Sequence, residues 1–220
     1  LSDHLHRNPA YYEAYNLLIR CYYETNRYEP AMELAKMLMQ TNAALPCFAN
    51  NYYISYAMHH QGKEINPISI LKNYENPFIE YNYSVLKEDK KSHNFKKTPT
   101  LKSKLLFMDF HFNVIKENII TFIENNNQNI TPTSLNKTII KFGRESFNQN
   151  DIEVSGGSSV SRRHCIIINS KDNIWLYDLE STGTYINDEK VNLKIPLIGF
   201  NKITIDDVDF TITTDKNKLL

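Results

Sequence analysis

Long apolar runs are missing from this sequence of 220 residues. A membrane-spanning helix needs about 20 mostly apolar residues, and a secretory signal needs a shorter apolar core near the N-terminus. Neither pattern occurs, so we expect no membrane segment and no secretion signal. An initiating methionine is also missing, and we expect Leu1 to be a fragment boundary with further residues upstream.

Cysteine is scarce in the chain. The three cysteines, Cys21, Cys47 and Cys165, are widely spaced and form neither a C-x-x-C pair nor a zinc-binding pattern. An odd number of scattered cysteines suits a reducing compartment better than a disulfide framework. We therefore predict an intracellular, cytoplasmic protein without a metal site.

A net charge is missing as well, because 25 Lys and Arg residues balance 25 Asp and Glu residues. The chain as a whole therefore has no attraction to nucleic acid or anionic lipid, and we expect neither as a partner. One local excess occurs between residues 87 and 104, where seven lysines stand against two acidic residues. We interpret it as a solvated linker, and contact with an acidic partner is the alternative.

The common catalytic signatures are also missing. The sequence contains no G-x-x-x-x-G-K, H-E-x-x-H or G-x-S-x-G motif. Its double glycine, Gly156-Gly157, is not followed by a predicted helix, which argues against a nucleotide site. We therefore predict that the chain is not an enzyme, has no catalytic residues and uses no cofactor.

Helical periodicity marks the N-terminal part. Residues 9–38 predict two helices separated by the polar pair Asn26-Arg27. The apolar residues that recur at helical spacing are Tyr11, Tyr15, Leu18 and Tyr22 on the first helix and Ala31, Leu34, Ala35 and Leu38 on the second. The small residues Ala31 and Ala35 let two helix backbones approach closely.

This order of aromatic, leucine and small residues resembles the tetratricopeptide repeat. A further copy is predicted from Asn51 to Gly62, with Ile54 and Met58 in place, and residues 67–74 supply its second helix. We assign residues 1–86 to an all-α, TPR-like helical-repeat domain that contacts another protein. Eight tyrosines either line a peptide-binding face or fill the core, and we favour the core. They are Tyr11, Tyr12, Tyr22, Tyr23, Tyr28, Tyr52, Tyr53 and Tyr56.

Residues 101–122 predict one long amphipathic helix. Apolar residues repeat there at alternating steps of four and three, namely Leu101, Leu105, Met108, Phe112, Ile115, Ile119 and Phe122. Its apolar face is broader than a two-helix seam requires, which favours a cap on the helical array over a dimer-forming coiled coil. We assign residues 87–134 to the basic linker and this capping helix, and the Asn-rich residues 125–132 to the domain boundary.

The periodicity changes to two after Thr133. Short β-branched runs alternate with turn clusters, which is typical of an antiparallel sandwich. The runs are residues 138–140, 165–168, 174–177, 184–186, 203–205 and 210–213. We predict an all-β sandwich over residues 135–220.

Three motifs stand in order within this part. They are Phe142-Gly143-Arg144, Ser161-Arg162-Arg163-His164, and the turn from Ser181 to Asn187. Their order and spacing resemble the forkhead-associated (FHA) domain. That resemblance implies a β-sandwich that binds phosphothreonine peptides on loops at one end.

A phosphate group needs a guanidinium or ammonium group, hydroxyl donors and backbone N–H groups. The resemblance implies that the phosphopeptide contacts are Arg144, Ser161, Arg162, Ser181 and Thr182. It implies structural support from Gly143, His164, Gly183 and Asn187. Thr182 stands where many family members carry asparagine, and Ser159 lies near the place where they set sequence preference.

The sequence therefore predicts a phosphothreonine-binding adaptor whose helical repeats make a second protein contact. Its partner would be a phosphothreonine-containing protein, either a Ser/Thr kinase or a kinase substrate. One alternative is the regulatory half of a bacterial-type transcription regulator whose DNA-binding domain lies upstream of residue 1. Another is a structural scaffold with an inactive phosphate site.

Overall fold

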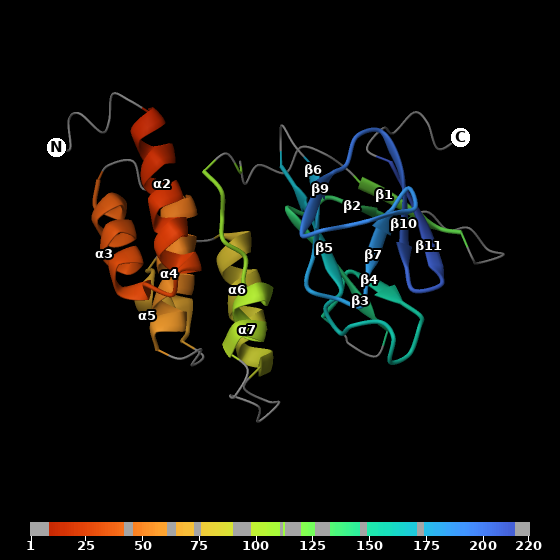
Figure 1. The fold of residues 1–220 in the computed structure, drawn as a ribbon, viewed down its shortest axis with the longest axis horizontal. Coiled ribbons are helices and arrows are strands. Elements are labelled where there is room, and N and C mark those ends of the chain that lie inside the picture. Colours follow the sequence, from red (N-terminus) through yellow and green to blue (C-terminus); the bar gives the residue numbers. More distant parts are fainter. Residues whose placement is uncertain are drawn as a thin grey trace. The chain divides into compact units, whose positions relative to one another are not determined.

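The computed structural model describes residues 9–41, 46–60, 65–72, 76–89, 98–110, 112, 120–125, 133–145, 149–170 and 174–213. The chain forms two compact units, Leu1–Phe112 and Asn113–Leu220. The first is helical and the second consists of β-strands (Figure 1). Among these residues no helix is both long enough and apolar enough to span a bilayer.

The described part of the helical unit contains six helices. They are α2 (Pro9–Glu24), α3 (Tyr28–Met39), α4 (Pro46–His59), α5 (Pro67–Ile70), α6 (Pro77–Asp89) and α7 (Thr98–Lys104). The predicted pair over residues 9–38 is confirmed as α2 and α3, and Asn26 turns the chain between them with a φ of 61°. Helix α4 packs against α2, α3 and α6. The repeat character of these helices stays a prediction.

The buried face of α2 differs from the predicted one by a single position. The structure exposes Tyr11 and Leu18, by 48% and 40% of their surface, and half-buries Tyr15 and Tyr22. The residues it buries instead are Tyr12, Asn16, Ile19 and Tyr23. The physical reason is Asn16, a polar residue that lies inside because its amide donates a hydrogen bond to the Met108 carbonyl.

The other helices agree with the prediction in part. Ala31, Ala35 and Leu38 of α3 are buried, as are Ile54 and Met58 of α4. Helix α5 ends at Ile70, short of the predicted end of the second helix at Tyr74. Gly62, Tyr74 and the lysines between residues 90 and 97 lie outside the described residues.

The eight tyrosines, which we expected mainly in the core, lie in mixed surroundings. Tyr12, Tyr23 and Tyr53 are buried, whereas Tyr11 is exposed. The other four, Tyr22, Tyr28, Tyr52 and Tyr56, are half-buried.

The long helix predicted over residues 101–122 is wrong. Helix α7 ends at Lys104, residues 105–110 are neither helix nor strand, and residues 120–124 form the first strand of the second unit. Ile115 and Ile119 lie outside the described residues. The apolar spacing suggested one helix, but the apolar residues of this stretch belong to the cores of two different units. Leu105 and Met108 are buried in the helical unit, and Ile120 and Phe122 are buried in the sandwich.

The predicted domain boundary over residues 125–132 is wrong for the same reason. The units divide between Phe112 and Asn113, so the sandwich begins before residue 135. Its first strand, β1 (Ile120–Glu124), lies between β2 (Thr133–Leu135) and β11 (Val208–Thr213) in one sheet. The Asn-rich residues therefore connect two strands of a single sheet.

The second unit is a sandwich of two sheets. One has the order β2-β1-β11-β10-β7-β8 and the other β4-β3-β5-β6-β9. The remaining strands are β3 (Ile139–Arg144), β4 (Ile152–Val154), β5 (Cys165–Asn169), β6 (Ile174–Asp178), β7 (Thr184–Ile186), β8 (Glu189–Lys190), β9 (Lys194–Pro196) and β10 (Phe200–Ile205). Five of the six predicted β-runs lie wholly within strands, and the sixth, residues 138–140, overlaps β3, which begins at Ile139.

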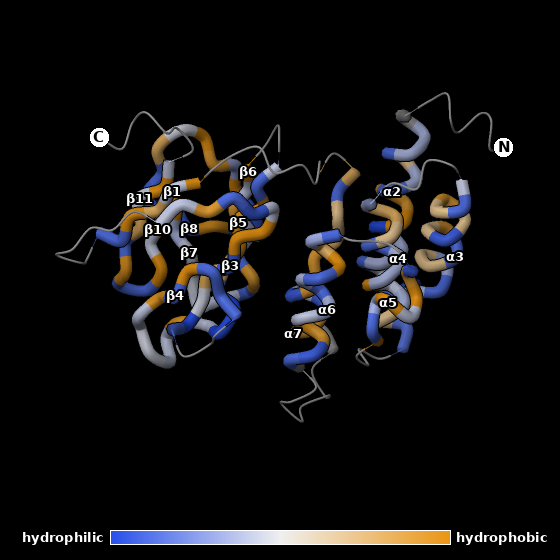
Figure 2. The backbone as a smooth tube through the Cα atoms, turned by 180° about the vertical axis from the view of Figure 1, so that it is seen from behind, coloured by the Kyte–Doolittle hydropathy of each residue, from blue (hydrophilic) through white to orange (hydrophobic). Residues whose placement is uncertain are grey.

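The core of the sandwich is apolar and draws on both sheets. Figure 2 shows hydrophobic stretches along strands of each. Phe142 of β3 packs edge-on against Phe122 of β1 and Phe210 of β11, with ring centroids 5.4 and 5.8 Å apart. Such edge-to-face pairs add to the stabilisation from burial alone. This rigid core fixes the ends of β3, β5 and β6, from which the candidate site is built.

Candidate functional site

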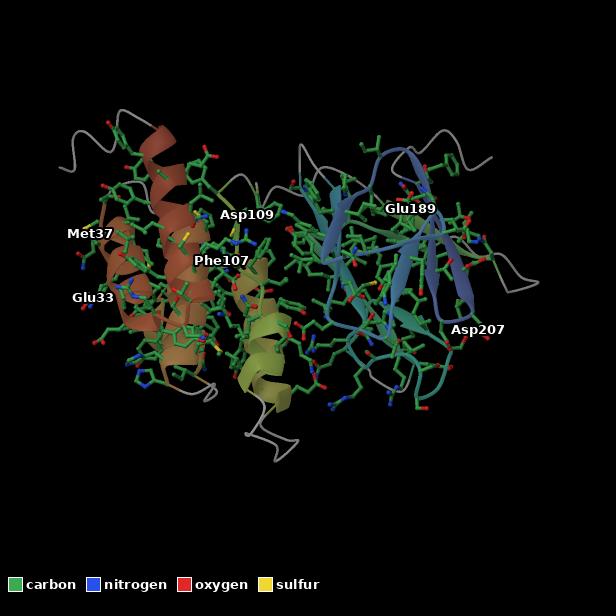
Figure 3. The ribbon with its side chains drawn as sticks, in the orientation of Figure 1. Glu33, Met37, Phe107, Asp109, Glu189 and Asp207 are labelled. Atoms are coloured by element: carbon green, nitrogen blue, oxygen red, sulfur yellow. The ribbon has the colours of Figure 1, made fainter. Side chains whose placement is uncertain are left out.

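The three sequence motifs meet at one end of the sandwich. Strand pairing sets Phe142 opposite Cys165 and Cys165 opposite Asp178, so the end of β3, the start of β5 and the end of β6 lie at the same edge. The β4–β5 loop (residues 155–164) and the β6–β7 loop (residues 179–183) therefore emerge together. The β10–β11 turn lies at the same end of the sandwich, because Ile205 pairs with Thr184 (Figure 3, where Asp207 marks this turn).

Arg144 ends β3 and lies against the β4–β5 loop. Its backbone N–H donates to the Ser161 carbonyl over 3.0 Å, and its Nε donates to the Val160 carbonyl over 2.8 Å. A weaker contact of 3.5 Å joins Nη2 to the Ser158 carbonyl. A guanidinium has five N–H donors, so this anchored group keeps donors for an anion.

Gly143 is required by a close approach of the backbone. A Cβ at this position would lie 2.1 Å from the Arg162 carbonyl oxygen, so any side chain would push the β4–β5 loop away. The same carbonyl accepts a hydrogen bond of 2.9 Å from the Asn150 amide. Sequence reasoning missed this role of Asn150, which no motif letter marks.

His164 is fully buried and joins two of the loops. Its Nδ1 accepts the Ser161 N–H over 3.2 Å, so Nε2 carries the proton and donates to the Gly183 carbonyl over 3.1 Å. Burial lowers the pKa of the imidazole, which keeps it neutral and able to accept at Nδ1. This is the geometry that a bracing role requires.

Asp178 organises the β6–β7 loop, and sequence reasoning missed it. Its carboxylate accepts hydrogen bonds from the Ser181 N–H (3.0 Å), the Ser181 hydroxyl (2.5 Å) and the Thr184 hydroxyl (2.6 Å). The Ser181 hydroxyl also accepts the Gly183 N–H over 3.1 Å. Gly183 has a φ of +149°, which favours glycine. The Ser181 hydroxyl is therefore committed inside its own loop.

Thr182 joins the β6–β7 loop to the β4–β5 loop. Its exposed hydroxyl donates to the Ser159 carbonyl over 2.7 Å. The Ser159 hydroxyl in turn contacts the Asp206 carboxylate of the β10–β11 turn at 2.5 Å. Asp206 is a further residue at these loops that the sequence analysis did not single out.

Ser161 and Arg162 are more exposed than the buried residues on either side of them, Val160 and Arg163. Arg162 is exposed and Ser161 is half-buried. Within the described residues the Ser161 hydroxyl makes no hydrogen bond, whereas its backbone groups bind His164 and Arg144. The arrangement offers a guanidinium, a hydroxyl and a second arginine on neighbouring loop positions, a donor set that suits a phosphate or another anion.

Asn187 lies beyond the other end of β7, in the β7–β8 turn. Its side-chain oxygen accepts the Lys202 N–H over 2.9 Å, and its own N–H donates to the Lys202 carbonyl over 2.9 Å. Asn187 and Asp188 have φ values of 50° and 70°, as a tight hairpin turn requires. Asn187 supports this hairpin and does not join the three loops.

A family model for the FHA domain matches residues 140–205. The matched span contains all three motifs and the β4–β5 and β6–β7 loops, and residues 140–205 form an FHA domain. No curated protein matches the chain.

Solved structures of similar fold include the FHA domain of the CT664 protein from Chlamydia trachomatis. It is 19% identical over 43% of this chain and 96% of its own, with a TM-score of 0.39. The N-terminal FHA domain of S. cerevisiae Rad53p, solved with a phosphothreonine peptide, is 22% identical over 44% of this chain and 94% of its own (TM-score 0.38). Mycobacterium tuberculosis EmbR, solved with a low-affinity phosphopeptide, is 16% identical over 92% of this chain and 55% of its own (TM-score 0.40).

Proposed function

We propose that the FHA domain at residues 140–205 binds phosphothreonine peptides and that the chain serves as a signalling adaptor. The observation that carries this proposal is the Arg144 guanidinium, anchored on the β4–β5 loop that also presents Ser161. A phosphothreonine carries a charge of about −1.5 to −2 and accepts several hydrogen bonds. Arginine matches that geometry better than any other side chain.

We assign direct phosphate contact to Arg144, Ser161 and Arg162. The hydroxyls of Ser181 and Thr182 already serve Asp178 and Ser159, so we assign these two residues to loop shape. Thr182 then stabilises the site from within, although it lacks the amide with which an asparagine could hold a peptide backbone. Asp206 at the same loops disfavours an acidic peptide residue beside it, since like charges repel.

The chain acts by binding rather than by catalysis in this proposal. The phosphorylated partner is a Ser/Thr kinase or one of its substrates. The helical unit makes a second contact with another protein, so the two units would bring two proteins together.

The test is calorimetric titration of the full chain with a phosphothreonine peptide selected from a degenerate library. We expect micromolar affinity, roughly −7 to −8 kcal/mol. Arg144→Ala should weaken binding by about 1.5–3 kcal/mol, the scale of a hydrogen bond to a charged group. As a control, Lys36→Ala removes one exposed positive charge from α3 and should leave the affinity unchanged.

Equal binding of the phosphorylated and unphosphorylated peptides would contradict the proposal. No binding of any library member would point to the structural scaffold instead.

A further inference from the structure

Residues 105–110 of the helical unit are neither helix nor strand and pair with no strand among the described residues. Helices and sheets satisfy backbone polar groups internally, but a lone extended segment cannot. Here the partners are buried asparagine side chains from three different helices: Asn16 of α2, Asn50 and Asn51 of α4, and Asn82 of α6. Each is at most 3% exposed.

Asn82 and Asn51 each form hydrogen bonds with both the N–H and the carbonyl of a single residue. The Leu106 N–H donates to Asn82 Oδ1 over 2.7 Å, and Asn82 Nδ2 donates to the Leu106 carbonyl over 3.0 Å. The Met108 N–H donates to Asn51 Oδ1 over 2.8 Å, and Asn51 Nδ2 donates to the Met108 carbonyl over 2.9 Å. Residues two apart on an extended chain share one edge, so the asparagines occupy the place of a neighbouring strand.

The asparagines also bind one another in a row. Asn82 donates to Asn50 (2.8 Å), Asn50 to Asn51 (3.0 Å) and Asn51 to Asn16 (2.8 Å). Asn50 and Asn16 add second donors to the Leu106 and Met108 carbonyls, over 2.9 and 3.2 Å. Both amide hydrogens of Asn82, Asn50 and Asn51 are thereby used, which fixes the orientation of the row.

Packing alone does not account for this row. The backbone N–H and C=O groups of Leu106 and Met108 cannot be exchanged for apolar groups, so their burial requires hydrogen-bond partners. A row of amides along one strand edge does what an apolar core cannot, because it holds an extended backbone without regard to its side chains.

The side chains of the segment define what else the groove selects. Leu106 and Met108 are buried. Asp109 forms an ion pair of 2.9 Å with Arg20 of α2, and the Phe107 ring lies 5.9 Å from that of Tyr23 (Figure 3, where Phe107 and Asp109 are labelled). The order of the occupant is therefore apolar, aromatic, apolar and acidic.

We propose that this groove, formed by Asn16, Asn50, Asn51, Asn82 and Arg20, is a peptide-binding site, with residues 105–110 as its tethered internal ligand. The exchanging partner is an unphosphorylated, extended segment of another protein with the apolar–aromatic–apolar–acidic order. The inference rests on the second contact proposed above for the helical unit and states its chemistry. It does not depend on phosphopeptide binding at the sandwich.

The test opens the groove in the full chain. The double variant Leu106→Pro/Met108→Pro removes the two backbone N–H groups that donate hydrogen bonds to Asn82 and Asn51. The probe is a fluorescent peptide with the sequence of residues 105–112, and binding is read by anisotropy. A tethered segment competes at an effective concentration in the millimolar range, so the wild type should bind the probe weakly and the variant at least tenfold more tightly.

Two N-methylated probes test whether binding depends on the backbone N–H groups at the positions of Leu106 and Met108. A peptide N-methylated at the positions of Leu106 and Met108 should not bind, whereas one methylated at Phe107 and Asp109 should keep its affinity. Equal loss with both probes would overturn the proposal. So would a variant that folds and does not bind, or one that forms a dimer in sedimentation through a second copy of the segment.

Amide hydrogen exchange of the wild type decides the matter if the double variant fails to fold. The amides of Leu106 and Met108 should exchange slowly, and millimolar unlabelled peptide should accelerate both by displacing the segment. Unchanged exchange would overturn the proposal. Phosphopeptide titration of the same samples separates the two ideas, since it should be unaffected whether or not the groove accepts a peptide.

Discussion

The two units of this chain build their interiors in different ways. In the sandwich, strand pairing satisfies the backbone, and the space between the sheets is filled by apolar side chains such as Phe122, Phe142 and Phe210. In the helical unit an extended segment runs through the interior, and buried asparagines satisfy its backbone. The difference shows that the polarity of an interior follows from where the backbone hydrogen bonds go.

The unfolding of each unit can be followed separately in one sample, because the two units have different spectroscopic signals. The single tryptophan of the chain, Trp175, lies on β6 and reports the sandwich alone. Helical circular dichroism reports the other unit. Each variant below should therefore shift one signal and leave the second in place.

The largest expected effect comes from removing β1. An isolated chain that begins at residue 113 should fold, whereas one that begins at residue 126 should not. The shorter chain loses Ile120 and Phe122 from the core, and truncations of such residues cost about 2–5 kcal/mol each, against a total stability of about 5–15 kcal/mol. Thermal melting followed by Trp175 fluorescence measures this loss of stability. Similar melting temperatures would mean that the sandwich does not need its first strand.

The next largest effect is expected in the helical unit. Asn51→Leu leaves the Met108 N–H buried without its acceptor and removes a donor from the Met108 carbonyl. Each buried group left unpaired costs about 1–3 kcal/mol. Denaturant unfolding by circular dichroism should show this loss, with the Trp175 transition unchanged. The control Glu33→Ala, at an exposed position of α3, should stay within about 0.5 kcal/mol of the wild type.

A smaller effect is expected in the loops of the sandwich. Gly143→Ala forces a Cβ against the Arg162 carbonyl and should cost about 1–3 kcal/mol, as overpacking does. The same shift moves the β4–β5 loop, so phosphopeptide affinity should fall with stability. Ser158→Ala on the exposed part of that loop is the control for stability. A Gly143→Ala protein as stable as wild type would show that the loop yields easily.

The smallest effect is a pH dependence centred on His164, the only histidine after residue 112. Burial lowers the pKa of this imidazole in the folded state. Below about pH 6.5 the unfolded chain binds a proton that the folded chain does not. The stability of the fold therefore decreases as the pH is lowered from about 6.5 to the pKa of His164 in the folded state. The slope is at most about 1.4 kcal/mol per pH unit.

Trp175-detected unfolding at a series of pH values, without phosphopeptide, measures this slope. His164→Phe should lower stability at neutral pH and flatten the dependence below pH 6.5. An identical slope in the variant would assign the effect to other groups.

The two units also differ in how far their sequences predicted them. Six of the strands were predictable because Val, Ile, Thr and aromatic residues alternate over short runs between turn residues. Strand β1 was not, because its apolar residues also fitted the spacing of a helix. The three loop motifs could be located because each lies next to a strand end. Asp178 and Asn150 could not, because their roles depend on which carbonyl or hydroxyl faces them across the loops.

The helical unit was harder to predict because its interior is partly polar. Asn16 reads as a surface residue, so the apolar stripe of α2 was predicted one position away from the true one. The apolar spacing of residues 101–122 fits a helix equally well whether or not the backbone has other partners. Nothing local to residues 105–110 indicates that asparagines from other helices take up its hydrogen bonds.

The sequence by itself determined the class of each unit, the helix pair over residues 9–38, the six β-runs and the order of the FHA motifs. These depend on neighbours a few residues apart, whose side chains share one face of a helix or strand. Only the tertiary structure decided that β1 belongs to the sandwich, that Ser181 serves its own loop, and that asparagines hold residues 105–110. Contacts such as Asn16 with Met108, 92 positions apart, decide which backbone groups find partners inside the protein, and no local pattern records them.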